Sequence, residues 1–191
     1  MPVPKLSEEE YLEIDRAAEV PSEYLDGKMF PIEAVTYEHS RVSVKISRWF
    51  DEKLQGTPCA VAASPLRVRV SPAKYVVPDH AIVCGSPVFA DFHRDTLTNP
   101  KVIIEILSPS TGDYDQGTKF ALYCRLQSFV EYIFVSQDEA RVAIYHKNAE
   151  DHWDFRIFKG LDAVARIDSL NLHLPLKEIY EGIDLPPKTD D

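Results

Sequence analysis

The stretch KVIIEILSPS, Lys101 to Ser110, decides the fold that we expect for this chain of 191 residues. Five of its residues are apolar and nearly continuous: Val102, Ile103, Ile104, Ile106 and Leu107. Such a run is typical of a strand that is buried on both faces. Glu105 interrupts the run, and a carboxylate there costs stability unless a positive group meets it.

A second acid interrupts another expected strand in the same way. In VVPDHAIVC, Asp79 shares a strand face with Val77, Ala81 and Val83. Pro78 cannot donate to a sheet ladder, so we expect the sheet to be at an edge or locally broken there. Asp79 is then accessible from one side.

Two expected helices also carry a charge on their apolar face. Lys119 precedes Leu122, Tyr123 and Leu126 at helical spacing, and Glu38 precedes Val42 by four residues. Charged residues that interrupt several apolar patterns of one chain indicate a functional site, because the loss of stability is accepted only where chemistry needs the charge.

These four residues are of the types that phosphodiester hydrolysis requires. Two carboxylates from neighbouring strands offer the hard oxygen ligands that Mg²⁺ prefers, so Asp79 and Glu105 are the expected ligands. Lys119 is placed to orient the attacking water and to stabilise developing charge, and Glu38 to assist through water or a second metal. Purely structural roles for these residues stay open. Glu105 and Lys119 fit a buried structural ion pair, Lys119 fits a side chain that extends to solvent, and Glu38 fits a favourable helix dipole.

Composition limits the class of protein. The chain has a formal net charge of −10 and is 45% hydrophobic, so it can bury a sizeable core but is not a general nucleic-acid binder. The acidic N-terminus lacks a signal-peptide layout, and no apolar run reaches the roughly 18 residues that span a bilayer, so we expect a soluble cytoplasmic protein. Cys59, Cys84 and Cys124 are far apart and odd in number, which predicts small core residues and no disulfide framework.

One segment runs against the acidic balance, because residues 39–74 carry seven basic and two acidic residues. The candidates for contacts with a phosphate backbone are Arg41, Lys45, Arg48, Arg67 and Arg69. The alternative is a solvated helix face followed by an exposed strand face, since Arg67 and Arg69 alternate with apolar residues.

The remaining pattern predicts an α/β or α+β sheet domain. The expected elements are an acidic helix at 6–19 with a Ser7/Glu10 capping box, a hairpin turning at Asp26-Gly27, a helix from Glu38 to Leu54, strands CAVAA and LRVRV, the two acid-bearing strands, a helix from about Asp115 to Leu126, strands EYIFVS, RVAIYHK and WDFRIFK, and a terminal helix LPLKEIYEGI.

Several of these stretches together resemble the Uma-type putative restriction endonucleases, a bacterial group in the PD-(D/E)XK nuclease superfamily. The matching segments include EYLDGKMF, YEHSRVSVKI, VVPDHAIV, NPKVIIEILSPST, DYDQGTKFALY and EYIFVSQDEARVAIY, and they cover nearly the whole chain. The resemblance implies a restriction endonuclease-like core, with a mixed central sheet flanked by helices.

The resemblance also implies roles for individual residues. Asp79 and Glu105 would be metal ligands, with the carbonyl of Ile106 as an extra ligand, and Glu38 would be the acid of the first core helix. The superfamily pattern has lysine two residues after the second acid, where this chain has Leu107. Lys119 would then be the migrated lysine.

We therefore expect residues 1–185 to form one restriction endonuclease-like domain, followed by a disordered tail at 186–191. The expected protein is a cytoplasmic, Mg²⁺-dependent DNA endonuclease that forms a homodimer, with Mn²⁺ able to replace Mg²⁺. Two rivals stay open: a non-catalytic interaction protein, dimeric, that retains the nuclease fold, and a metal-dependent hydrolase of a small phosphate ester.

Overall fold

The computed structural model describes residues 5–108 and 114–185. Its helices are α1 (Glu8–Ala17), α2 (Tyr37–Lys53), η1 (Asp115–Lys119), α4 (Phe120–Tyr123), η2 (Asp168–Leu170) and α5 (Leu176–Tyr180). Its strands are β1 (Ser22–Leu25), β2 (Lys28–Pro31), β3 (Cys59–Ala63), β4 (Arg67–Ser71), β5 (Lys74–Val76), β6 (His80–Cys84), β7 (Thr96–Leu97), β8 (Val102–Leu107), β9 (Glu131–Ser136), β10 (Arg141–Lys147), β11 (Trp153–Lys159), β12 (Val164–Ile167) and β13 (Leu172–Pro175). The expected tail at 186–191 lies outside the described residues.

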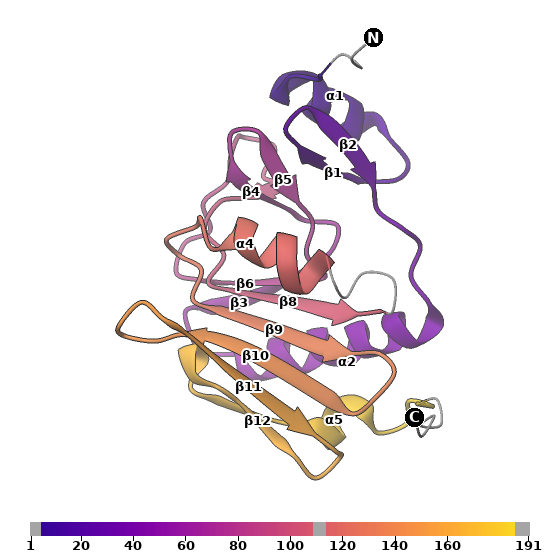
Figure 1. The fold of residues 1–191 in the computed structure, drawn as a ribbon, viewed down its shortest axis with the longest axis vertical. Helices are drawn as coiled ribbons and strands as arrows, with labels where there is room; N and C mark the ends of the chain where they lie inside the picture. Colours follow the sequence, from indigo (N-terminus) through magenta and orange to yellow (C-terminus); the bar gives the residue numbers. More distant parts are fainter. Residues whose placement is uncertain (1–4, 109–113, 186–191) are drawn as a thin grey trace.

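A six-stranded mixed sheet in the order β11-β10-β9-β8-β6-β3 forms the centre of the molecule. Helix α2 lies on one face and α4 on the other (Figure 1). Residues on alternate positions of β8 enter different cores: Val102, Ile104 and Ile106 pack toward α2 and α5. Ile103 and Leu107 pack toward α4. The prediction of a strand buried on both faces is confirmed.

A second sheet carries the N-terminal part of the chain, in the order β2-β1-β5-β4-β7. The β1–β2 hairpin turns at Asp26 and Gly27, which both have positive φ, as the turn residues predicted. The capping box also forms: Glu10 N–H donates to Ser7 Oγ at 3.2 Å, and Ser7 N–H donates to the Glu10 carboxylate at 2.7 Å.

The helix expected from Asp115 begins differently from the prediction. Residues Asp115–Lys119 form a π-helical turn, and only Phe120–Tyr123 are α-helical. A wide turn of this kind displaces the side chains that follow and is often found at functional sites.

The expectation for the cysteines is wrong. Cys59 and Cys84 are 25 residues apart, but the antiparallel register of β3 and β6 places them opposite each other, and they form a disulfide. Cys124 is free and exposed instead of belonging to the core. Spacing along the chain could not reveal a pairing that strand register creates.

The five-stranded and six-stranded sheets meet at the segment between β5 and β6. Val77, Pro78 and Asp79 lie in this connection, outside both ladders. The predicted break in the sheet at Pro78 is confirmed, and it leaves Asp79 next to the point where the chain leaves one sheet and enters the other.

Candidate active site

Asp79 and Glu105 are held side by side by strand register. The antiparallel ladder between β6 and β8 pairs His80 with Ile104, so Asp79 comes next opposite Glu105. Side chains replace the ladder at this point. Asp79 N–H donates to Glu105 Oε2 at 3.3 Å, and Ile106 N–H donates to Asp79 Oδ2 at 2.7 Å. The two predicted acids are therefore adjacent, at the point where the β6–β8 ladder ends.

The other oxygen of Asp79 faces helix α2. Asp79 Oδ1 lies 3.0 Å from His39 Nε2, in the first turn of that helix. Burial would raise the pKa of Asp79, but the His39 hydrogen bond and the Ile106 amide outweigh it and hold the pKa below its usual value. Asp79 is therefore an ionised carboxylate that two donors hold in place.

Glu105, the acid that interrupts the apolar run of β8, faces Lys119, so a positive group meets the buried carboxylate. Lys119 Nζ lies 2.9 Å from Glu105 Oε1, and Tyr123 OH donates to the same oxygen at 3.3 Å. Glu105 is 3% exposed and Lys119 5%. Burial raises the pKa of Glu105 well above its usual value even with Lys119 beside it.

Lys119 is surrounded by more negative charge than it can neutralise. Its Nζ lies 3.3 Å from Glu23 Oε1 and 3.6 Å from Asp115 Oδ1, in addition to Glu105, and donates to the Val77 carbonyl at 3.0 Å. Burial would lower the pKa of Lys119, but the carboxylates raise it well above its usual value. We call Lys119, Glu105, Glu23 and Asp115 the lysine cluster.

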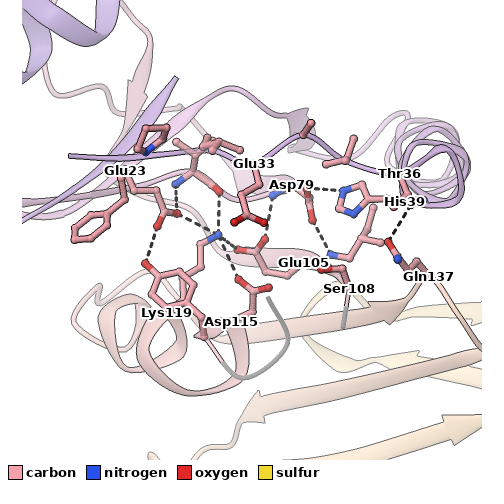
Figure 2. Close-up of a pocket in the computed structure, with 18 of the residues that line it drawn as sticks. Glu23, Glu33, Thr36, His39, Asp79, Glu105, Ser108, Asp115, Lys119 and Gln137 are labelled. Carbon is pink, nitrogen blue, oxygen red and sulfur yellow. Dashed lines mark hydrogen bonds and ion pairs between the residues drawn. The ribbon is translucent and has the colours of Figure 1, made fainter. Parts of the chain in front are cut away.

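The lysine cluster fixes the connection between the two sheets. Val77 N–H donates to Glu23 Oε1 at 3.0 Å, and the Val77 carbonyl accepts from Lys119. Tyr114 OH donates to the other Glu23 oxygen at 2.6 Å. Residues from β1, the β5–β6 connection, β8 and η1 thus meet around one ammonium group, as Figure 2 shows.

A pocket of about 580 Å³ opens over Asp79 and the lysine cluster. Its acidic side is formed by Glu23, Asp79, Glu105 and Asp115, and residues 30–36, at the end of β2 and in its connection to α2, also line it. Glu33 belongs to this segment, and Figure 2 shows its carboxylate directed toward those of Asp79 and Glu105. The acids are therefore at the base of a concave site.

Glu38 does not take the place that the sequence predicted. The buried residues of α2 are His39, Val42, Ile46, Trp49 and Phe50, so the buried face begins at His39. Glu38 is only half-buried and does not line the pocket. The predicted apolar face of the helix is confirmed, but in its first turn His39, and not Glu38, lies on that face and contacts Asp79.

The candidate phosphate-binding residues are dispersed. Arg67, expected on an exposed strand face, is 6% exposed and pairs with Asp15 and Asp95. Arg69 Nη2 lies 2.7 Å from Glu8 Oε1, and Lys45 Nζ donates to the Glu181 carbonyl. Arg41 and Arg48 are exposed on α2. None of the five lines the pocket.

Sequence analysis missed four titratable residues at the site: Glu23, Glu33, His39 and Asp115. Two of them carried a signal. His39 stands three residues before Val42 and seven before Ile46, a better helical spacing than that of Glu38. Asp115 stands four residues before Lys119, the spacing of an ion pair on one helical face. Glu23 had no local signal, because only the packing of the second sheet brings it to Lys119.

The donor set fits a divalent cation. Three carboxylates around one ammonium, with Asp79 and Glu33 beside them, leave an excess of negative charge in a pocket. Within residues 5–108 and 114–185, no group of three or more histidine, cysteine, aspartate or glutamate side chains is arranged as a ready metal site. Mg²⁺ needs only one or two protein carboxylates, with water and substrate phosphate completing its shell. Asp79 and Glu105 can supply those two.

Two proteins of Synechocystis sp. are similar in sequence to this chain. An uncharacterized protein of Synechocystis sp., slr1290, is 32% identical over 188 residues, which are 95% of this chain and 95% of that one. A second, sll1609, is 28% identical over 149 residues, covering 78% of this chain and 84% of that one.

A solved structure has the same fold. The crystal structure described as a putative nuclease belonging to DUF820 from Anabaena variabilis matches with a TM-score of 0.74 at 22% identity, over 92% of this chain and 97% of that one. In the part of the chain that the structure describes, no helix is long and apolar enough to cross a membrane. The model of the Uma2 family, described as "Putative restriction endonuclease", matches residues 8–177, and the chain belongs to this family.

Proposed function

We propose that this protein is a Mg²⁺-dependent DNA endonuclease whose catalytic residues are Asp79, Glu105 and Lys119. The observation that carries the proposal is the distance of 2.9 Å between Lys119 Nζ and Glu105 Oε1, next to Asp79 in one pocket. The family pattern has lysine two residues after the second acid, and Lys119 supplies that ammonium from the following helix.

Each residue has a role that its contacts support. Asp79 and Glu105 would hold the cation, with the Ile106 carbonyl as an extra ligand. When bound, Mg²⁺ supplies positive charge that stabilises the transition state of the phosphate. Lys119 Nζ orients the attacking water and donates hydrogen bonds to the oxygen on which charge develops.

The reaction adds one water molecule across a P–O bond. The water oxygen bonds to phosphorus, the bond to the leaving oxygen breaks, and one proton of the water ends on that oxygen. The pocket brings these groups together at its acidic side, where Asp79 is held in one orientation by His39 and Ile106. The products are a phosphate monoester end and a hydroxyl end.

Cleavage by Asp79→Asn and Lys119→Met variants tests the proposal. We expect each substitution to lower the cleavage rate of plasmid and oligonucleotide DNA in Mg²⁺ by about a hundredfold or more, since each removes a charge that acts on the transition state. Circular dichroism checks that the variants fold. Unchanged cleavage by both folded variants would contradict the proposal.

Matched controls separate the site from general charge effects. Asp154 and Lys159 are exposed on β11 and do not line the pocket. Asp154→Asn and Lys159→Met should therefore cleave within about twofold of the parent, as expected of surface substitutions away from a site.

One observation favours a second candidate, a non-catalytic interaction protein that keeps the nuclease fold. Lys119 is held by three carboxylates and a backbone carbonyl, which also suits a purely structural ion cluster. Calorimetry separates the two. The endonuclease should bind Mn²⁺ and lose this binding in Asp79→Asn, whereas the interaction protein should show no difference between parent and variant.

A further inference from the structure

The lining of the pocket combines two kinds of residue. Glu23, Asp79, Glu105 and Asp115 form what we call the acidic side. A set of apolar residues, which we call the apolar side, lines the same pocket: Leu25, Phe30, Pro31, Ile32, Ala34 and Val35. An apolar lining with a few convergent polar groups is typical of a site for a small organic group.

The size of the pocket suits one small unit of a substrate. About 580 Å³ lies within the range of about 300 to 1,000 Å³ that is usual for ligand pockets. Glu105 and Lys119 are 3% and 5% exposed, so a phosphate can reach them only by entering the pocket. The bases of a continuous duplex stay paired and stacked inside the helix, whereas an unpaired nucleotide can bring its base and its phosphate into one pocket.

Charge around the site also disfavours a long duplex. Binding along a duplex backbone depends on lysine and arginine contacts to many phosphates. Arg67 and Arg69 are held in ion pairs with Asp15, Asp95 and Glu8. Among the described lining residues, Lys119 is the one lysine or arginine, and three carboxylates already contact it.

The apolar side offers an aromatic surface. Phe30 is near the end of β2, lines the pocket and is 47% exposed. Bases stack on such side chains without regard to sequence, and the stacking contributes to affinity for single strands. Phe30 and Glu105 line the same pocket, so one nucleotide can present its base to the first and its phosphate to the second.

We propose that the pocket takes an unpaired nucleotide, with the base against the apolar side and the phosphate at Asp79 and Glu105. The substrate class is then single-stranded DNA, or an unpaired end or flap, and not continuous duplex. This inference rests on the endonuclease function proposed above, which it makes more specific.

Paired substrates of one sequence test the inference. The labelled oligonucleotide is offered to the parent protein as a single strand, as a blunt duplex and as a duplex with an unpaired flap, all in Mg²⁺ at low salt. We expect the single strand and the flap to be cut at least about tenfold faster than the blunt duplex. Equal rates on the three substrates would overturn the substrate class but leave the endonuclease function intact.

A substitution of Phe30 tests the base-binding side. Phe30→Ala should raise KM for the single strand about fivefold with kcat little changed, because it removes stacking that is present before and during the reaction. Phe30→Trp should retain parental KM. Phe92→Ala is the matched control, since Phe92 is 85% exposed and does not line the pocket. An unaltered KM in Phe30→Ala would overturn the role of the apolar side.

Binding without cleavage distinguishes failure of the inference from failure of the proposed function. Fluorescence anisotropy with the labelled single strand in Ca²⁺ should show tighter binding than with the blunt duplex, and weaker binding by Phe30→Ala. This preference without cleavage of any substrate would support the pocket and contradict the endonuclease. Cleavage of nucleotides or small phosphate esters alone, with no preference for the single strand, would overturn the inference.

Discussion

Two charge clusters of this molecule are balanced to different degrees. In the first, Arg67 pairs with Asp15 and Asp95 and donates to Thr96 Oγ1 at 3.1 Å. Arg16 contacts the same Asp95 at 2.8 Å and Asp91 at 2.6 Å. We call these residues the arginine network. It joins α1 to β4 and to the segment before β7. In the second, the lysine cluster, one ammonium faces three carboxylates.

On the proposed function, the arginine network serves structure and the lysine cluster serves chemistry. The arginine network sets two guanidinium groups against three aspartates, and bidentate contacts satisfy most of its donors. The lysine cluster keeps unbalanced negative charge beside a pocket. Unbalanced charge lowers stability and is retained where a ligand will balance it.

Removal of Arg67 should produce the largest loss of stability. Arg67→Met leaves Asp15, whose side chain is fully buried, without its cation. Breaking a buried pair in this way costs about 3–5 kcal/mol, and we expect a loss of this size in the free energy of unfolding by urea. The cleavage rate of the folded fraction should stay near the parental value, because Arg67 does not line the pocket.

Arg69 provides the control on the same strand. Its pair with Glu8 is partly exposed, at 31% and 29% of the two side chains. Arg69→Met should cost no more than about 1 kcal/mol, the usual contribution of an exposed pair. Equal losses in the two variants would show that the buried network has no special structural role.

The sequence predicted most of the fold because the patterns that specify it are local. The predicted strands EYIFVS, RVAIYHK and WDFRIFK coincide with β9, β10 and β11. β12 and β13 were not predicted, because these short strands pair only with each other. Periodicity also does not reveal which strand belongs to which sheet, because that depends on pairing between strands that are far apart in the sequence.

The residues of the candidate site were predicted only where they interrupt a local pattern. Asp79, Glu105 and Lys119 each break a local apolar pattern, and Glu105 and Lys119 form the ion pair that the sequence left open as an alternative. Arg67 was misinterpreted as exposed because alternation within β4 could not show that Asp15 of α1 covers the face on which Arg67 lies. Glu23 comes from a different sheet, and only tertiary packing places it.

Glu33 and Glu38 form a matched pair that sharpens the comparison at the pocket. Glu33 lines the pocket and points toward Asp79 and Glu105, whereas Glu38 does not line it (Figure 2). Glu33→Gln should therefore weaken Mn²⁺ binding about tenfold by calorimetry, because it removes one negative charge near the cation. Glu38→Gln should change it less than twofold. The reverse order would restore Glu38 as the acid of the first core helix.

The smallest expected effects concern pH, and the two clusters should respond with opposite slopes. Contacts with Arg16, and further with Arg67, hold the pKa of Asp95 below its usual value. Its stabilising contribution is therefore present above the unfolded pKa of about 3.9 and is lost as the pH falls further. Asp95→Asn should be about 1 kcal/mol less stable than the parent at pH 7, a modest value because Asp95 is partly exposed. The difference should disappear in acid.

Glu105 should show the contrary behaviour in metal-free protein. Burial raises its folded pKa, so the protonated form favours the native state. That contribution is complete below the unfolded pKa of about 4.3 and is lost as the pH rises. Glu105→Gln should therefore gain stability relative to the parent as the pH rises above the unfolded pKa, by about 1 kcal/mol. Urea unfolding of both variants as a function of pH measures the two slopes. Slopes of the same sign would mean that Lys119 fully balances Glu105, and that the lysine cluster, like the arginine network, is structural.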